Sequence, residues 1–418
     1  MSTDLALFER IEVVKGPSST LYGLGTLSGF INRVSKKPRR ERAASLVTQL
    51  GSFDTYRAEA DATGPLDADK QYAARLVAVY EDSGAFIDGV DNRVALVAPS
   101  FDALLGAHTR LLLQAHHQDQ SGTPSVGIPA FVGADGELRA PNVSRSFLFG
   151  NTKGARTEST QTQGSARLEH EVSDRWLASL HLQKSWVDTD LRRGVYGSGL
   201  DGRSRTGTLL DPETGEGYEL GLKGEWFEQR LGATLSVFRQ ERDKVPLADR
   251  LPGDPPGSGF SKSAGLQRAD GVELEMAGQP MAGLTLALAA SWIDSKFDER
   301  SDPNFGQVTP DTVEQQISVY GNYEIAAGPL RGLGFGATVV AVGDHYGGIQ
   351  GDNTTFAKPY ERVDLNFSYT AIPGWDLSLQ VRNVFDARYL ETVSDPGSGN
   401  FFGSPTAVLF RAEYNFDL

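Results

Sequence analysis

Cysteine is absent from all 418 residues of the chain. Its absence excludes disulfide bonds, thiolate metal sites and cysteine nucleophiles together. Long hydrophobic runs are also missing, because no stretch approaches the roughly 18 consecutive apolar residues that a membrane-spanning helix needs. A helical membrane protein is therefore excluded. The opening residues, MSTDLALFER, lack the basic start and apolar core of an export signal, so we expect no signal peptide in this chain.

Positive charge is scarce relative to negative charge. The 40 Lys and Arg residues are outnumbered by 54 Asp and Glu residues, which gives a formal net charge of -14. Nucleic acid is excluded as a partner, because phosphate binding needs clustered cations. The one dense basic run, KKPRRER at 36–42, is typical of a solvated turn.

Signals for catalysis or for a resident metal are missing too. The sequence contains no HExxH, GxSxG, P-loop or EF-hand pattern. Of its six histidines, His116 and His117 are adjacent in an expected strand and must point to opposite faces. The stretches at 211–217 and 386–400 combine carboxylates with glycine but lack the regular spacing of a Ca²⁺ loop. We therefore expect no enzyme activity, no cofactor and no metal site.

Alternation of apolar and polar residues with a period of two is the dominant positive signal, and it indicates strands with one apolar face. In the last segment Val408, Phe410, Ala412, Tyr414 and Phe416 alternate with polar residues, and only Leu409 breaks the rule. About sixteen such segments are expected, near 43–51, 54–63, 71–81, 92–101, 107–119, 159–171, 176–188, 217–227, 230–242, 266–277, 284–297, 312–324, 334–345, 360–370, 375–385 and 406–418.

The lengths of these segments indicate a membrane barrel. Most have about 9–13 residues, close to the roughly 9–11 that a tilted strand needs to cross a bilayer and longer than the 5–6 typical of soluble strands. Connections alternate between short turns and long loops, as in outer-membrane barrels. A soluble sandwich or propeller also alternates, but aromatic residues at strand ends, such as Trp176, Trp186 and Trp375, favour a membrane girdle. The sequence thus predicts an all-β, transmembrane antiparallel β-barrel of about sixteen strands.

The opening stretch FERIEVVKGPSSTLYGLGTLSGFINRVSKKP, at 8–38, resembles the end of the plug domain of TonB-dependent outer-membrane receptors. The residues that carry this resemblance in order and spacing are Glu9, Arg10, Glu12, Lys15, Gly16, Pro17, Tyr22, Gly23, Gly29 and Asn32. The resemblance continues through the barrel at 268–297, 320–325, 332–347 and 360–390, where the chain is similar to ferric-siderophore receptors.

The resemblance implies a domain division and a function. Residues 1–42 would be the C-terminal remnant of a plug, and residues 43–418 an outer-membrane β-barrel. The expected function is ferric-siderophore uptake across the outer membrane of a Gram-negative cell, with iron only as part of the ligand, and with lipid and, in the family, TonB as partners. Family members have a longer plug with an energy-coupling box and twenty-two strands. We therefore expect a shortened receptor whose junction lies within 196–226.

Aromatic and arginine residues in the long loops are the candidates for siderophore recognition, because a ferric siderophore is bulky, often anionic and partly apolar. These candidates are Phe131, Arg145, Phe147, Phe149, Arg192, Arg193, Tyr196, Phe260, Tyr346, Phe401 and Phe402. Each of them could instead pack its own loop or belong to the girdle. Two other functions stay open for the whole chain, a passive porin-like channel and a non-functional receptor fragment.

Overall fold

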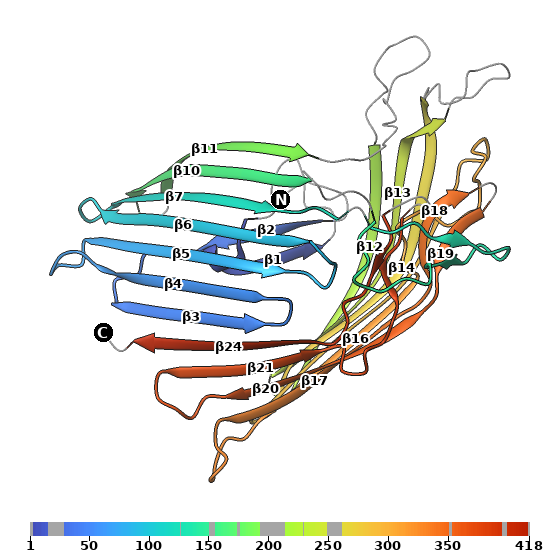
Figure 1. Ribbon diagram of the computed structural model, residues 1–418. Coiled ribbons are helices and arrows are strands. Elements are labelled where there is room, and N and C mark those ends of the chain that lie inside the picture. The colour runs from blue at the N-terminus through green and yellow to red at the C-terminus, as the bar shows by residue number, and fades with distance from the viewer. Residues whose placement is uncertain are drawn as a thin grey trace.

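A computed structural model describes residues 3–15, 29–125, 127–149, 155–173, 176–192, 214–228, 230–248, 261–350, 353–394 and 399–416. The regular secondary structure of these residues is almost entirely β-strand, apart from one short 3-10 helix, η1 (Leu5–Leu7). Sixteen strands make one antiparallel sheet, which confirms the expected fold class and strand number (Figure 1). Among the described residues, no helix has the length and apolar character to cross a membrane.

Each of the sixteen alternating segments corresponds to one strand of this sheet. The N-terminal half comprises β3 (Ala43–Gly51), β4 (Thr55–Pro65), β5 (Tyr72–Gly84), β6 (Asp91–Leu104), β7 (Thr109–Gly122), β10 (Arg156–Ser173) and β11 (Trp176–Arg192). The C-terminal half comprises β12 (Thr214–Trp226), β13 (Leu231–Ala248), β14 (Ser261–Met281), β15 (Leu284–Phe297), β16 (Gln315–Glu324), β17 (Leu333–Val342), β20 (Tyr360–Tyr369), β21 (Trp375–Arg382) and β24 (Ala407–Phe416).

The last strand of the sheet pairs with its first strand. β24 lies antiparallel to β3, with Phe410 opposite Leu50 and Tyr414 opposite Leu46. Strand order around the sheet therefore runs from β11 through β3 and β24 to β12. β11 and β12 stand apart at the two ends of the sheet, so the sheet is open between them (Figure 1). The connection between β11 and β12, residues 193–213, lies outside the described residues, so the junction expected within 196–226 stays a prediction.

The two faces of the sheet differ in polarity as the alternation predicts. On β4, Tyr56 and its alternate neighbours are exposed, whereas Arg57, Glu59 and Asp61 point to the other face and are partly buried. We call the latter the inner face, because residues 3–15 and 29–42 lie on it. Leu409, the exception in the last segment, lies beside Gly51 of β3, where a Cβ atom would approach its Cδ1 to 3.0 Å. A glycine thus makes room for the misplaced leucine.

Aromatic residues gather near both ends of the strands on the outer face. Toward the short turns these are Tyr72, Trp176, Trp226, Tyr323, Phe335, Tyr369, Trp375, Tyr414 and Phe416, and toward the long loops they are Tyr56, Tyr80, Trp186, Tyr218 and Trp292. Trp176 and Trp186 on β11 are roughly 33 Å apart along the strand at about 3.3 Å per residue. With a tilt of about 40° this is about 25 Å, the height of an outer-membrane barrel's apolar band.

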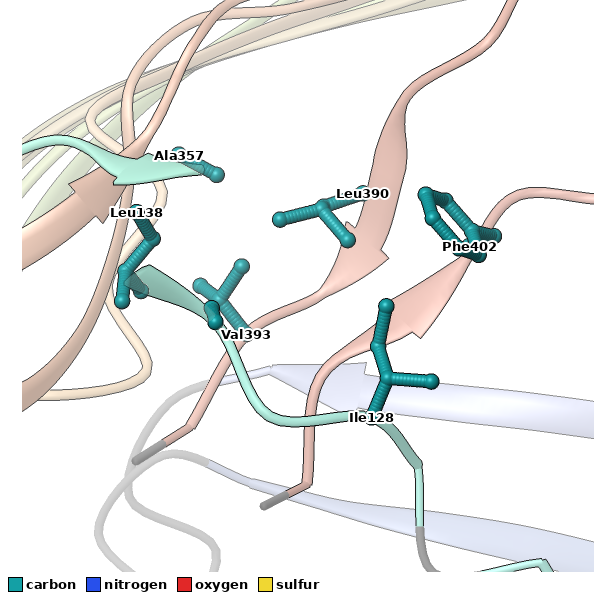
Figure 2. Close-up of a cluster of buried hydrophobic side chains, with 7 residues drawn as sticks. Ile128, Leu138, Ala357, Leu390, Val393 and Phe402 are labelled. Atoms are coloured by element: carbon teal, nitrogen blue, oxygen red, sulfur yellow. The ribbon is translucent and has the colours of Figure 1, made fainter. Parts of the chain in front are cut away.

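The long loops form a small core of their own beyond one end of the strands. Three two-stranded hairpins lie there, β8 (Phe131–Val132) with β9 (Leu138–Arg139), β18 (His345–Gln350) with β19 (Asn353–Ala357), and β22 (Leu390–Thr392) with β23 (Phe401–Phe402). Their buried apolar side chains meet in one cluster (Figure 2), which consists of Ile128, Ala130, Leu138, Ala357, Leu390, Val393 and Phe402. These loops therefore hold one another in place.

The described part of the N-terminal segment contains two paired strands. β1 (Phe8–Lys15) pairs with β2 (Gly29–Ser35), and Glu12 lies opposite Asn32. Leu7, just before β1, packs against Val77 and Leu96 of the inner face. We call residues 3–15 and 29–42 the N-terminal segment. The domain boundary between residues 42 and 43 stays a prediction.

The adjacent residues Thr338 and Val339 of β17 give a direct test of the two faces. Val339 is on the outer face and Thr338 is on the inner face, opposite Asp364. We expect Val339→Arg to lower the free energy of unfolding by about 2–4 kcal/mol in a lipid bilayer, because the guanidinium would enter hydrocarbon. Thr338→Arg, the matched control, should cost clearly less. Urea unfolding in vesicles measures both, and equal losses would contradict this assignment of the faces.

Candidate functional site

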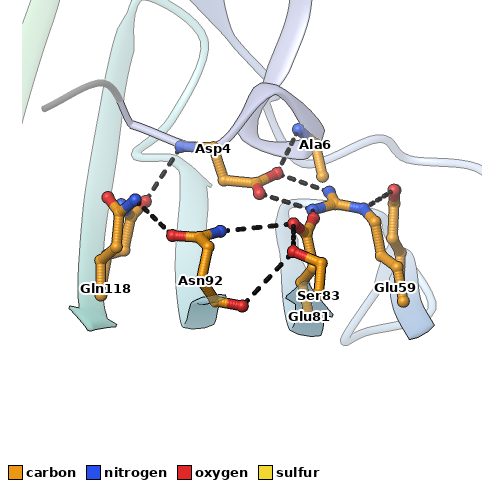
Figure 3. A network of polar contacts seen from close by, with 9 residues as sticks. Asp4, Ala6, Glu59, Glu81, Ser83, Asn92 and Gln118 are labelled. Atoms are coloured by element: carbon orange, nitrogen blue, oxygen red, sulfur yellow. Dashed lines mark hydrogen bonds and ion pairs between the residues drawn. The ribbon is translucent and has the colours of Figure 1, made fainter. Parts of the chain in front are cut away.

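Arg57 is the centre of the first contact between the N-terminal segment and the inner face. Its guanidinium donates to both carboxylate oxygens of Asp4 at 2.7 Å, to Glu59 at 2.7 Å and to Glu81 at 2.9 Å (Figure 3). Only 11% of the Arg57 side chain is exposed. Because the forked guanidinium matches a carboxylate in two places, this contact fixes orientation as well as position.

A second contact is centred on Asp61, four residues further along β4. Its carboxylate accepts from Lys36 of the N-terminal segment at 2.8 Å and from Arg75 of β5 at 2.6 Å. Arg75 also donates to the backbone carbonyl of Lys37 at 3.0 Å. The segment after β2 is therefore held by both a side-chain ion pair and a backbone hydrogen bond.

The third contact involves Asp102 of β6, whose side chain is fully buried. It pairs with Arg40 of the N-terminal segment and with Arg110 of β7, the latter at 2.7 Å. Gln118 of β7 also accepts from the backbone N–H of Asp4 at 2.9 Å. A buried carboxylate without its cation strongly destabilises the folded structure. These contacts therefore favour one position of the N-terminal segment on the inner face.

The two adjacent histidines point to opposite faces of β7, as predicted. His116 is buried on the inner face and His117 is exposed on the outer face, where it contacts Thr162 at 2.8 Å. His116 borders a cavity of about 30 Å³ together with Leu7, Lys36 and Arg75. Among the described residues, no group of three His, Asp or Glu side chains is arranged to hold a metal ion.

The described part of the plug motif forms hydrogen bonds within the N-terminal segment. Glu12 accepts from Arg10 at 2.5 Å and from Asn32, across the hairpin, at 2.7 Å. Glu9 accepts from Arg39 at 2.7 Å. The backbones of Lys15 and Gly29 pair at the end of the hairpin, whereas Gly16, Pro17, Tyr22 and Gly23 lie outside the described residues.

Two of the candidate ligand residues are engaged in holding the loops. Arg145 donates to Asp386 at 2.6 Å and to the carbonyl of Ala387, and its hydrogen bond helps to hold the pKa of Asp386 below the usual range. Phe402 is 6% exposed, belongs to the loop core and lies under the Arg388 guanidinium at 4.6 Å. The structure thus gives both residues a packing contact, and their role in recognition stays a prediction.

The other candidates differ in exposure. Phe131, on β8, is 68% exposed, and Phe147 and Phe149 are also exposed. Tyr346 lies 6.1 Å from Phe356 between ring centres, and Phe401 pairs with Thr392 in the β22–β23 hairpin. Arg192 is the last residue of β11, and its side chain is not among the parts that the structure describes. Arg193, Tyr196 and Phe260 lie outside the described residues altogether.

Sequence reasoning missed several residues that fix the loops. Asn383 is almost fully buried and donates to the carbonyls of Ala387 and Ser404 at 2.9 and 2.8 Å. Glu137 pairs with Arg139 and Lys358, both at 3.0 Å, which links the first long loop to β19 and lowers the pKa of Glu137. No local pattern could have paired Glu137 with Lys358, which are more than two hundred residues apart in the sequence.

The inner face also has a part that lies away from the N-terminal segment. A hollow of about 440 Å³ lies over β12 to β16. Its lining is mostly small or apolar, with Met276 and Leu288, and its polar side chains are Lys223, Thr234, Glu275, Ser318 and Tyr320. The ion pairs described above reach only β4 to β7. The N-terminal segment is thus attached to one part of the wall.

Known proteins with a similar sequence belong to one class of outer-membrane receptor. Residues 195–384 match the family model described as TonB dependent receptor-like, beta-barrel. The metal-pseudopaline receptor CntO of Pseudomonas aeruginosa is 25% identical over 560 aligned positions, covering 93% of this chain and 77% of the relative. The ferric-pyoverdine M114 receptor PbuA of Pseudomonas sp. is 30% identical over 62% of this chain and 30% of its own length.

Solved structures with the same fold include other receptors of this class. The ferripyoverdine receptor of Pseudomonas aeruginosa, bound to ferripyoverdine, superimposes with a TM-score of 0.77 at 18% identity, over 99% of this chain and 77% of that one. The siderophore receptor PiuA from Acinetobacter baumannii gives a TM-score of 0.81 at 14% identity, over 99% and 87%.

Together these matches confirm the resemblance seen in the sequence. The chain is a relative of the TonB-dependent outer-membrane receptors, and its antiparallel sheet, open between β11 and β12, has the fold of their barrels. This family consists of receptors and transporters of the Gram-negative outer membrane and not of enzymes.

Replacing Arg57 tests the attachment of the N-terminal segment. We expect Arg57→Ala to weaken docking by about 3 kcal/mol, since it leaves Asp4, Glu59 and Glu81 without their shared cation. Hydrogen–deuterium exchange of residues 3–15 should become faster by about a hundredfold or more. Arg411→Ala is the matched control, because this inner-face arginine pairs with Glu413 instead. Unchanged exchange in the Arg57 variant would contradict the role of this contact.

Proposed function

We propose that this protein is an outer-membrane receptor for a ferric siderophore. The observation that supports this most strongly is the plug-type hairpin docked on the inner face of a TonB-dependent-receptor sheet. Relatives named as ferric-pyoverdine, ferrioxamine B and ferrichrome receptors match 43–62% of the chain. Lipid of the outer membrane would surround the apolar band on the outer face.

Within this proposal, the exposed loop aromatics are the residues that contact the ligand. Phe131, Phe147 and Phe149 present flat apolar surfaces to solvent beside the loop core. Arg145 and Phe402 would hold these loops in position and would not contact the ligand themselves, because Arg145 pairs with Asp386 and Phe402 is part of the loop core. Apolar surface beside ordered polar groups suits a chelate that is bulky and partly apolar.

The alignment with the metal-pseudopaline receptor supports a sheet with fewer strands than the sheets of the relatives. It spans 560 positions, more than the 418 residues of this chain, so the aligned region of the relative contains stretches that this chain lacks. We propose that strands between β11 and β12 account for part of this difference, since the sheet is interrupted there.

Siderophore binding can be measured by quenching of tryptophan fluorescence in detergent. Ferripyoverdine, ferrioxamine B and ferrichrome are suitable probes, each with its iron-free form as a control. For a probe that binds, we expect Phe131→Ala to weaken affinity by about tenfold, because roughly 1.4 kcal/mol of aromatic contact is lost. Phe305→Ala is the matched control, an exposed loop phenylalanine outside the candidate set. Failure of all three chelates to give saturable binding would argue against the receptor proposal.

A second candidate function is passive diffusion through the barrel. It is favoured by the hollow over β12 to β16, whose lining of mostly small side chains includes the charged Lys223 and Glu275 and which lies apart from the contacts described for the N-terminal segment. Water and small solutes could pass through the lumen beside this hollow if no other part of the chain blocked the lumen.

Conductance in planar bilayers separates the two functions. A receptor whose lumen is blocked should give no steady openings, whereas a channel should give large and steady ones at neutral pH. If the N-terminal segment is the block, Arg57→Ala should raise the frequency of openings several-fold and Arg411→Ala should leave it unchanged. Steady conductance in the unaltered protein would favour the channel over the receptor.

A further inference from the structure

The short turns at one rim of the sheet carry exposed apolar side chains. Among the described residues, seven connections lie at this rim, joining β4 to β5, β6 to β7, β10 to β11, β12 to β13, β14 to β15, β16 to β17 and β20 to β21. Each has a large apolar side chain that is 43–64% exposed, either in the connection or in the last two residues of the strand before it. We call these residues the turn set, and they are Leu66, Leu105, Val172, Phe227, Met281, Leu330 and Ile372.

The tight connections at the opposite rim partly bury their apolar residues instead. There, residues 52–54 join β3 to β4 and residues 85–90 join β5 to β6. Phe53 and Phe86 in these connections are partly buried and meet edge to face, with their ring centres 6.2 Å apart. Single exposed apolar residues are common on protein surfaces. Their recurrence in every short turn, and at one rim only, calls for a common cause.

The turn set extends the apolar outer face of the sheet. Leu66 is ten residues after Tyr56 of β4, and Leu105 is eight residues after Val97 of β6, and all four side chains are exposed. The backbone N–H groups of Leu66 and Leu105 still donate across the ladder, at 2.8 and 2.7 Å. Residues an even number apart on a strand share a face. The outer face therefore continues into these turns without a polar border.

The depth of the turn set matches the edge of the apolar band. Leu66 lies ten residues from Tyr56, and Phe227 lies nine residues from Tyr218, both aromatic residues toward the long loops. These separations are about 33 and 30 Å along the strand, or about 25 and 23 Å across a membrane at a tilt of about 40°. The apolar band of an outer-membrane barrel is about 25 Å tall. The turn set therefore lies where hydrocarbon meets the headgroups on the short-turn side.

We propose that the turn set inserts into the phospholipid surface on the short-turn side and fixes the height of this rim in the membrane. Members in neighbouring turns are two strands apart, about 10 Å, so they form a row of separate side chains and not one patch. A protein partner would have to follow the whole rim to cover them. A lipid surface covers all of them at once, and it is continuous with the lipid around the outer face.

Charges within the short turns suit a layer of phospholipid headgroups. Although the whole chain has a formal charge of -14, the described parts of these connections are neutral. Their three cations and three carboxylates are Lys70, Arg230, Arg331, Asp67, Asp69 and Glu228. A neutral rim is not repelled by zwitterionic or anionic headgroups. Arg331 directly follows Leu330, so its charge can reach the headgroups while its stem stays beside the apolar side chain.

Anchoring at the turns places the excess length of the strands on the other side of the membrane. β14 has 21 residues, which is about 69 Å along the strand and about 53 Å across the membrane at a tilt of about 40°. The apolar band takes up about 25 Å of this height. Because β14 ends at Met281 beside its short turn, about half of the strand projects beyond the band on the long-loop side. The loop core is thereby lifted clear of the lipid.

The absence of cysteine allows single thiols to test this anchor. Leu66→Cys and Lys70→Cys occupy one turn, and Phe227→Cys and Glu228→Cys occupy another, so both members of a pair face the same side of a vesicle. Each variant is folded into vesicles of phosphatidylethanolamine and phosphatidylglycerol and treated with a charged maleimide that does not cross the bilayer. We expect the thiols at 66 and 227 to react about tenfold more slowly than those at 70 and 228, a factor that corresponds to about 1.4 kcal/mol. Rates in urea correct for intrinsic reactivity.

A polarity-sensitive dye on the same thiols identifies what shields them. At positions 66 and 227 we expect stronger quenching by a phospholipid nitroxide near the headgroup than by aqueous iodide, and the reverse at 70 and 228. Equal reaction rates within each pair would overturn the proposal, because the turns would then stand in water. Slow reaction without lipid quenching would show shielding by the protein itself, and slow reaction only in native membranes would show a protein partner. Either result would also overturn the proposal, and none of these outcomes depends on siderophore binding.

Discussion

Pairing between β3 and β24 is the constraint on which the rest of the structure depends. It joins residues 43–51 to residues 407–416, the two ends of the sheet-forming chain, and so makes one sheet from two halves. A slip by one residue would turn Leu50 and Leu46 to the inner face while Phe410 and Tyr414 stayed outside. The register of this one pair therefore sets a common outer face for both halves, and the apolar band follows from it.

The same alternation that makes the outer face apolar supplies the polar groups that hold the N-terminal segment. Arg57, Asp61 and Arg75 occupy inner positions on β4 and β5, and each has a partner in that segment or beside it. Removing such charges from water is costly, and their mutual attraction offsets the cost only with good geometry. These contacts thus contribute more to where the segment docks than to how stable the whole protein is. Leu7, in contact with Val77 and Leu96, adds the apolar part of the interface.

Sequence patterns predicted the strands well because a period of two is a local property. They predicted sixteen strands and the opposite faces of His116 and His117. They could not predict partners across long separations, such as Asp4 with Arg57 or Glu137 with Lys358. Loop aromatics show the same limit, because nothing local distinguishes the buried Phe402 from the exposed Phe131. Both lie in polar loops, and only the packing of three hairpins separates them.

Among the described residues, the ion pairs that hold the N-terminal segment lie on one part of the sheet, away from β12 to β16. Along the sheet, β4 to β7 lie between β3 and β10, whereas β12 to β14 lie at the other end of the strand order. Strands lost between β11 and β12 would come from a region that holds none of the ion pairs to Asp4, Lys36 or Arg40. Loss there in whole hairpins keeps the antiparallel order, because each hairpin removes one upward and one downward strand. The attachment of the N-terminal segment is therefore separate from the number of strands near β11 and β12, which could change without disturbing it.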